Sequence, residues 1–240
     1  MPVTVRLTAD RTALAVTLSD ERPDLVAAVT ALGLGTGRPV VAVVGGAAGL
    51  DDAPVDSLEA VFAGPVAAVI RRFGAIAVDG GTDTGVMGML GRAQPAAPAF
   101  PLVGVAATRM VRGPGRGTGE TLEPHHTHFV LVPGAAWGDE AAYLARVATL
   151  LAGPAPSVTI LANGGEIAFD DCRFSLAEGR PVLVLAGTGR TADRIAAAAA
   201  DPAGCRDERA VTLALSPLVR VVDATDLAAT ENRLRALLAA

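Results

Sequence analysis

The chain has 240 residues, of which 51 % are apolar and only 3 % aromatic, so we expect one domain with a core of Ala, Val and Leu. Its formal net charge of −5 gives no basic surface for nucleic acid, and no apolar run approaches the roughly 18 residues of a membrane span. All 20 basic residues are arginine, which excludes a Walker A lysine and a lysine Schiff base and leaves phosphate contacts to arginine and backbone N–H groups.

The first 38 residues predict an extension that precedes the core. Val3–Leu7 and Ala13–Leu18 alternate in polarity on either side of Thr8–Arg11, which is typical of a β-hairpin. Pro23–Leu32 follows as a short helix that ends at Gly33. Residues 39–240 are expected to form the core of the same single domain.

Seven continuous apolar runs follow, and each predicts a strand that is buried on both faces of a sheet. They are Val40–Val44, Ala75–Val78, Leu102–Val105, Phe129–Val132, Val158–Leu161, Val182–Leu185 and Val219–Val222. Helix-like stretches lie between them: Ser57–Phe73, Val86–Ala93, Asp139–Leu151, Glu166–Glu178, Thr191–Ala200 and Thr225–Leu238. Alternating strands and helices predict an α/β fold with a Rossmann-like, doubly wound and mostly parallel sheet.

The segment Met110–Thr121 fits neither a predicted strand nor a predicted helix. It is rich in glycine, has no periodicity, and carries Arg112 and Arg116 close to Arg109. We favour a solvated surface loop. The alternative is a lid that closes these arginines over a bound anion.

Glycine-rich segments follow five of the predicted strands. Ligands of a doubly wound sheet bind beyond the carboxyl ends of the strands, so these segments are expected to converge on one site. None has the G-x-G-x-x-G spacing of dinucleotide-binding folds, and we expect a phosphate and a ribose to be held mostly by the main chain. The segments are Gly45-Gly46, Gly80-Gly81-Thr82, Pro133-Gly134 with Trp137-Gly138-Asp139-Glu140, Asn163-Gly164-Gly165-Glu166 and Gly187-Thr188-Gly189-Arg190.

The junction Val78–Met87 is the most informative of these. Its two glycines, Gly80 and Gly81, lead through Thr82, Asp83 and Thr84 into a helix that starts near Gly85, Val86 and Met87. The helix N-terminus adds a favourable dipole for phosphate. Both threonine hydroxyls are expected either to donate to the phosphate or to cap the helix, and Asp83 to bind ribose hydroxyls or to act as a cap.

Three groups of motifs keep a common order along the chain: Gly80–Met87, then His126–Val132 with Trp137–Glu140, then Gly187–Asp193. Together they resemble the SLOG superfamily, and more narrowly the SLOG domain of melastatin-type TRP channels and its free-standing prokaryotic relatives. The resemblance covers roughly residues 40–200. It implies a Rossmann-like fold that binds nucleotide-derived signals, with ADP-ribose-type ligands in the channel branch.

The resemblance also assigns roles to single residues. Trp137 matches an aromatic residue that lies beside the nucleotide, and Arg190 matches the arginine of a Gly-Ser-Gly-Arg-type loop. A neighbouring arginine, expected near Leu144, has no match; Arg146 is close but not aligned. From the residues alone, Trp137 could equally plug the core, whereas the glycines before Arg190 favour a bidentate phosphate contact over a solvated surface side chain.

The same superfamily contains Lonely Guy-type phosphoribohydrolases, which are marked by a Pro-Gly-Gly-x-Gly-Thr-x-x-Glu loop. The corresponding stretch here is Asn163–Asp171, in which Ile167-Ala168 replaces the Gly-Thr pair and Asp171 stands where the catalytic acid would be. Glu166 and Asp171 are therefore the candidate catalytic residues. We favour the alternative that both acidic residues only stabilise the dipole at a helix start.

The histidines and cysteines predict no metal site. His125, His126 and His128 have no third acidic or cysteine ligand at a suitable spacing, so we favour structural roles, with His128 near the ligand site as the alternative. Cys172 and Cys205 form no disulfide framework, and a buried, inert thiol is expected for each.

The sequence favours a cytoplasmic protein that binds or senses an ADP-ribose-like nucleotide without a required cofactor. The alternative is an enzyme that hydrolyses a nucleotide N-glycosidic bond, and a third hypothesis is a regulatory subunit whose nucleotide site controls a partner. We expect no nucleic-acid or membrane partner. A sensor without an attached effector domain needs an effector protein or a homo-oligomer to transmit its signal, and this need is the best argument for the enzyme.

Overall fold

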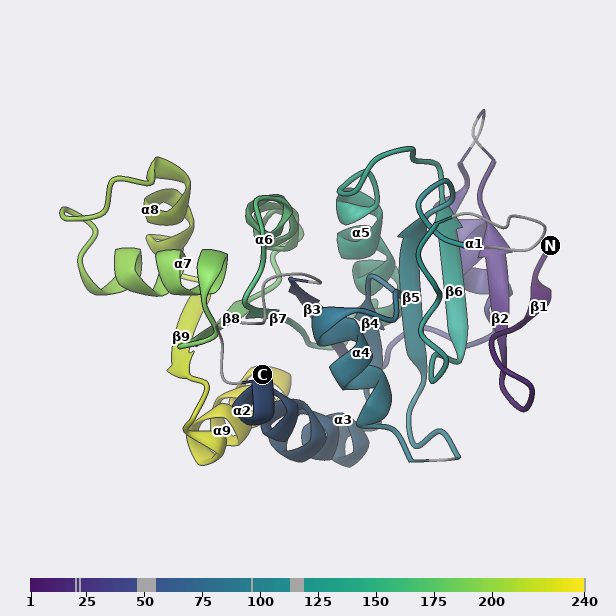
Figure 1. Cartoon of the computed structure of the whole chain (residues 1–240), viewed down its shortest axis with the longest axis horizontal. Helices are drawn as coiled ribbons and strands as arrows, with labels where there is room; N and C mark the ends of the chain where they lie inside the picture. The colour runs from purple at the N-terminus through teal and green to yellow at the C-terminus, as the bar shows by residue number, and fades with distance from the viewer. Residues whose placement is uncertain (20, 22, 47–54, 96, 113–118, 240) are drawn as a thin grey trace.

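A computed structural model describes residues 1–19, 21, 23–46, 55–95, 97–112 and 119–239. These residues form one nine-stranded sheet with helices on both faces (Figure 1). The strands are β1 (Val3–Arg6), β2 (Thr12–Thr17), β3 (Val40–Gly45), β4 (Ile76–Asp79), β5 (Leu102–Ala107), β6 (His128–Val132), β7 (Ser157–Ala162), β8 (Val182–Ala186) and β9 (Val219–Asp223). The helices are α1 (Leu25–Ala31), α2 (Val55–Val61), the π-helix η1 (Phe62–Val66), α3 (Ala67–Phe73), α4 (Gly85–Arg92), α5 (Ala141–Ala152), α6 (Ile167–Ala177), α7 (Arg190–Ala200), α8 (Glu208–Ala214) and α9 (Leu227–Leu238).

The sheet has the strand order β1-β2-β6-β5-β4-β3-β7-β8-β9, and every neighbouring pair except β1 with β2 is parallel. The predicted N-terminal hairpin and the predicted mostly parallel sheet are confirmed. From β3 the chain moves outward through β4, β5 and β6, then returns and moves outward on the other side through β7, β8 and β9. The order therefore reverses between β3 and β7, which is the topological switch point at which ligands of such folds bind.

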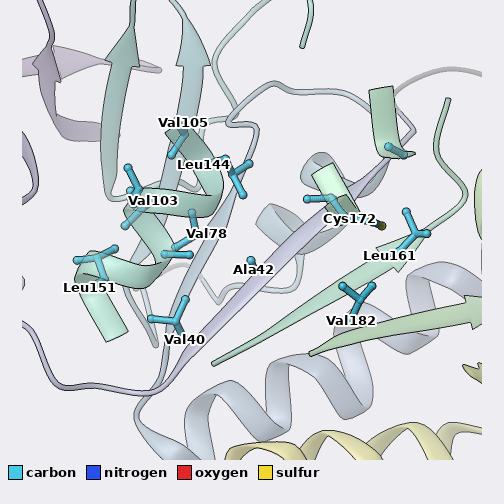
Figure 2. Close-up of a cluster of buried hydrophobic side chains, with 14 of the residues drawn as sticks. Val40, Ala42, Val78, Val103, Val105, Leu144, Leu151, Leu161, Cys172 and Val182 are labelled. Carbon is cyan, nitrogen blue, oxygen red and sulfur yellow. The ribbon is translucent and has the colours of Figure 1, made fainter. Parts of the chain in front are cut away.

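The core lies on both faces of the sheet. On β3, Val40, Ala42 and Val44 pack toward α1, α5, α6, α7 and α8, whereas Val41 and Val43 pack toward α2, η1, α3, α4 and α9. Figure 2 shows part of the first cluster, in which Leu144 of α5 and Cys172 of α6 lie near Ala42. Because both faces are covered, the strands must be apolar at every position, which is why the sequence shows continuous apolar runs.

Two helical features differ from the sequence prediction. The single helix predicted over Ser57–Phe73 is interrupted by η1, which contains Pro65. Proline has no N–H and its ring crowds the carbonyl four residues earlier, and the wider π-turn accommodates it. Helix α8 was not predicted, because seven residues are too few to show a period; its start is marked by Asp207, which accepts a hydrogen bond from the backbone N–H of Arg209.

None of the helices within the described ranges is long and apolar enough to cross a membrane.

Candidate ligand-binding site

A cavity of about 540 Å³ lies where loops from the carboxyl ends of β3, β4, β6, β7 and β8 meet. It therefore includes the switch point between β3 and β7. Of the residues predicted for a site, eleven line it: Gly45, Gly46, Gly80, Thr82, Thr84, Met87, Trp137, Gly165, Glu166, Asp171 and Arg190. Its other lining residues, which were not among the predicted site residues, are Val43, Val44, Glu120, Glu140, Leu144, Ile167 and Ala168, although Glu140 belongs to the Trp137–Glu140 motif.

The other predicted residues lie in the same loops but outside the cavity lining. They are Gly81, Gly85, Val86, Pro133, Gly134, Asn163, Gly164, Gly187, Thr188 and Gly189. Several of them have a visible packing role. A Cβ at Gly81, where φ is +71°, would lie 2.9 Å from Cα of Gly104, and a Cβ at Gly164 would lie 2.6 Å from Cβ of Ala168.

The turn after β8 is held by hydrogen bonds to Asp193, a side chain of the following helix α7. The N–H groups of Gly187 and Gly189 donate to the carboxylate of Asp193, at 2.7 and 3.0 Å, so they already have an anionic partner. The turn brings Arg190 to the cavity, where a Cβ at Gly165 would lie 3.1 Å from its Nη2 atom. Arg190 has a φ of +50°, a conformation that an L-residue with a side chain adopts at a cost of about 1–2 kcal/mol.

A buried charge network lies behind the Gly80-Gly81 loop. Both ring nitrogens of His126 lie within hydrogen-bond distance of carboxylates, Nε2 at 2.7 Å from Asp79 and Nδ1 at 2.8 Å from Glu123. Ionised carboxylates only accept hydrogen bonds, so both ring nitrogens of His126 must donate, which requires the protonated, positively charged imidazolium. Burial by itself would lower the pKa of His126, but the charges of Asp79 and Glu123 outweigh it and raise the pKa to about 9.

This Asp79–His126–Glu123 network fixes the wall of the cavity. Asp79 accepts a hydrogen bond from the N–H of Gly81 at 2.7 Å, and the N–H of Glu123 donates to the carbonyl of Gly81 at 3.0 Å. The next residues on either side, Gly80 and Thr82, line the cavity. The sequence analysis favoured a structural role for His126 but did not identify its partners, so the network was missed; the signal that could have found it is Glu123, three residues before His126.

The remaining histidines play structural roles. His125 contacts Glu123 through Nδ1 at 2.5 Å, and His128 contacts the hydroxyl of Thr127 at 2.7 Å. Burial lowers the pKa of His128, which does not line the cavity. Among the described residues no cluster of histidine, cysteine and carboxylate side chains is arranged to hold a metal.

The two candidate catalytic acids have different environments. Glu166 is exposed and forms ion pairs with Arg194 at 2.9 Å and Arg209 at 2.8 Å, and the hydrogen bond from Arg209 is the largest cause that lowers its pKa. Asp171 is half-buried, and within the described part of the chain no hydrogen bond reaches its carboxyl group. Burial, together with the neighbouring charge of Glu140, raises the pKa of Asp171 to about 8.

Three further predictions can be compared with the structure. Trp137 is 43 % exposed, so it does not plug the core. Cys172 is buried as expected, whereas the expectation of a buried thiol is wrong for Cys205, which is partly exposed beside the exposed start of α8. The proposed lid falls mostly on residues 113–118, with Arg116, which lie outside the described residues; on its flanks Arg112 donates from Nε to the carbonyl of Gly119 at 2.9 Å.

Comparisons with known proteins relate this fold to others. The crystal structure of TM1055, a structural-genomics target, is similar with a TM-score of 0.56 and 20 % identity, covering 83 % of this chain and 99 % of that one. The molybdenum cofactor carrier protein of Chlamydomonas reinhardtii is similar with a TM-score of 0.52 and 18 % identity, covering 85 % of this chain and 99 % of its own. At these identities the likeness concerns the fold alone.

A search of curated proteins gave no match. The sequence profile of the family described as "SLOG in TRPM, prokaryote" matches residues 38–233, which include every loop that lines the cavity. The chain belongs to this family of prokaryotic SLOG domains related to those of TRPM channels.

Proposed function

We propose that the chain binds a nucleotide-derived ligand of the ADP-ribose type in this cavity and acts as a sensor. The observation that carries the proposal is the position of the cavity, which opens at the switch point between β3 and β7. Its volume of about 540 Å³ lies within the range of roughly 300–1,000 Å³ that is usual for small-molecule sites.

One side of the cavity suits a phosphate. Gly46 and Gly80 have no side chains, so an anion can approach the backbone closely. Thr84 and Met87 place the N-terminal end of α4 on the same side, and its dipole favours negative charge. The hydroxyls of Thr82 and Thr84 lie 3.0 Å apart; one donates to the other, which leaves the second proton available to a ligand.

Another part of the cavity lining suits a base. Trp137 presents an exposed indole ring to the cavity, and stacking on an adenine contributes about 1–3 kcal/mol in comparable protein–base contacts. Among the described lining residues Arg190 is the basic one, and its left-handed backbone supports a functional role, because glycine would adopt that conformation without strain.

The test is calorimetry with ADP-ribose, cyclic ADP-ribose, NAD and AMP. We expect Arg190→Ala to weaken the binding of ADP-ribose by about tenfold to a hundredfold, the loss of one or two charge-assisted hydrogen bonds. The matched control is Arg146→Ala, which removes an exposed arginine of α5 that pairs with Glu178. Absence of binding by every nucleotide, or equal affinity in the two arginine variants, would contradict the proposal.

A second candidate function is hydrolysis of a nucleotide N-glycosidic bond. The observation that favours it is Asp171, a carboxyl group of the cavity that stays largely protonated at neutral pH and has no hydrogen-bond partner among the described residues. In such a reaction the acid gives its proton to the leaving nitrogen, the bond to the base breaks, and water attacks the ribosyl carbon; the proton that this water loses restores the carboxylic acid.

Chromatography of the same nucleotides after incubation separates the two functions. Release of a free base that is lost in Asp171→Asn and kept in Asp170→Asn would establish the hydrolase and refute a sensor without turnover. Asp170 is the matched control because it is the neighbouring acid of α6, pairs with Arg173 and lies outside the cavity lining. A sensor is further expected to change its oligomeric state or to bind an effector protein when ADP-ribose is added, which light scattering of the purified protein and its mixtures can measure.

A further inference from the structure

The charge of the cavity is uneven. Among its described lining residues, Arg190 is basic and four residues carry carboxyl groups: Glu120, Glu140, Glu166 and Asp171. A ligand that is negative along its whole length would be repelled by such a lining, because like charges in a partly desolvated site interact strongly. The arrangement of the four carboxyl groups therefore carries information about the ligand.

Two of the four need no ligand to balance them. Glu166 is exposed and its charge is compensated by the ion pairs with Arg194 and Arg209. Glu120 is exposed to solvent at the rim, where water screens its charge. The remaining pair, Glu140 and Asp171, is half-buried, and within the described part of the chain neither residue forms an ion pair.

Glu140 and Asp171 influence each other. The negative charge of Glu140 is one cause of the raised pKa of Asp171, and burial raises the pKa of Glu140 as well. The carboxylate of Glu140 accepts hydrogen bonds from the N–H of Gly138 at 3.1 and 3.2 Å, which holds it in place. A positive group placed between these residues would relieve their repulsion.

The surroundings of the pair are apolar. Leu144 lies one turn after Glu140 on α5, and Ile167 and Ala168 precede Asp171 on α6; all three line the cavity. Apolar side chains combined with two carboxyl groups suit a cation that has an apolar ring better than a hydrated ammonium or metal ion. The phosphate-compatible side, with Gly46, Gly80 and the start of α4, is built from other elements of the sheet edge.

We propose that the Glu140–Asp171 pair selects nucleotides that carry a positively charged heteroaromatic ring, of the N-ribosylated pyridinium class. The inference rests on the proposed function, because it assumes that the phosphates of a nucleotide occupy the glycine-lined side. It names the part of the ligand that the carboxyl pair recognises.

The probes are NAD+ and NADH, which have the same phosphates and sugars and differ in the charge of the nicotinamide ring. We expect wild-type protein to bind NAD+ about tenfold or more tightly than NADH in calorimetry at pH 7. In the double variant Glu140→Gln/Asp171→Asn this ratio should fall close to one. The control Asp170→Asn, on the same helix but outside the cavity, should keep the wild-type ratio.

Two further readouts test the mechanism. A cation beside the pair favours its ionised form, so NAD+ should release protons on binding and NADH should not, which calorimetry in buffers of different ionisation enthalpy detects. ADP-ribose lacks the ring and serves as the reference, since the double variant should bind it as tightly as wild type or more tightly.

The outcomes separate the two proposals. If ADP-ribose binds but the NAD+ to NADH ratio is one, or is unchanged in the double variant, the selective role of the pair is refuted and the proposed function stands. If none of the three probes binds to the folded wild-type protein, this inference is refuted, and if cyclic ADP-ribose and AMP do not bind either, the proposed function is refuted with it.

Discussion

The Asp79–His126–Glu123 network makes the stability of the protein depend on pH in a defined direction. The change to test is His126→Gln, which keeps a hydrogen-bond donor but cannot carry a charge. The pKa of His126 is about 9 in the folded protein against 6.5 for an unperturbed side chain, so the folded state holds the proton more tightly than the unfolded state. The stability from this proton is fully present below pH 6.5 and is lost as the pH rises through about 9.

The magnitude follows from the same pKa values. A rise from 6.5 to about 9, at 1.36 kcal/mol per pKa unit, corresponds to about 3 kcal/mol of unfolding free energy. The side chains of His126 and Asp79 are 0 % exposed, so solvent does not screen the interaction. Because domains of this size have a total stability of about 5–15 kcal/mol, the loss is readily measurable.

The assay is urea unfolding followed by circular dichroism at pH 6 and pH 9.5. Wild type should lose about 3 kcal/mol more than His126→Gln between these pH values. Asp171, whose raised pKa of about 8 also lowers stability as the pH rises, contributes equally to both proteins and cancels. The control His128→Gln should lose at least as much stability as wild type, because burial lowers the pKa of His128 and its contribution therefore increases, rather than decreases, stability as the pH rises through about 6.5.

An equal loss of stability in wild type and His126→Gln would refute this reasoning. Should the variant be too unstable to compare, an NMR titration of the His126 ring in the wild-type protein gives the pKa directly. A pKa near 6.5 would show that the carboxylates of Asp79 and Glu123 do not stabilise the imidazolium.

Three further predictions follow from the site and its support. Gly81→Ala should destabilise the protein by about 2–4 kcal/mol, because φ is +71° and the new Cβ would lie 2.9 Å from the backbone of Gly104. Gly80→Ala should change the unfolding free energy by less than about 0.5 kcal/mol yet weaken the binding of ADP-ribose. Denaturation of both variants measures the first effect, and calorimetry measures the second. Emission of Trp137, the single tryptophan, should shift or be quenched when ADP-ribose is added, and an unchanged spectrum at saturation would place the ligand elsewhere. Cys172 is buried and its pKa is raised by burial, so iodoacetamide should leave it unmodified in the native protein and alkylate it after unfolding, as mass spectrometry would detect.

The fold could be predicted from the sequence because its signal is local. Each buried parallel strand must be apolar throughout, so runs such as Val40–Val44 identify strands without knowledge of their neighbours. The strand order was not predicted, because right-handed crossovers restrict the arrangement of a βα chain without fixing which strands are neighbours. The π-turn at Pro65 was missed because the sequence does not show how the helix accommodates the proline. The helix α8 was missed because its seven residues are too few to show a helical period.

The site was predicted less completely because its side chains come together only in the folded chain. Glu140, at the start of α5, and Asp171 of α6 are 31 positions apart; each follows a segment expected at the sheet edge, but nothing in the sequence indicates that their carboxyl groups line the cavity as a pair. His126 and Asp79, which are 47 positions apart, meet for the same reason. Trp137 and Arg190 were found because each stands beside glycines at the end of a strand, where position along the chain already implies position at the sheet edge.

The glycine-rich segments look alike in the sequence, but in the structure the physical reason for glycine differs from one position to the next. At Gly45 a Cβ would lie 2.0 Å from the carbonyl oxygen of Ala162, so the close approach of β3 and β7 excludes a side chain. At Gly187 the φ of +83° requires glycine, although no described atom lies within 4 Å of a Cβ. Gly80 has neither constraint: its φ is not positive, and the nearest described atom to a Cβ, Cγ of Met87, is 3.8 Å away. Because neither backbone geometry nor packing within the described part of the chain accounts for glycine at this position of the cavity wall, we expect the proposed ligand to approach the backbone there, and Gly80→Ala is the variant that tests it.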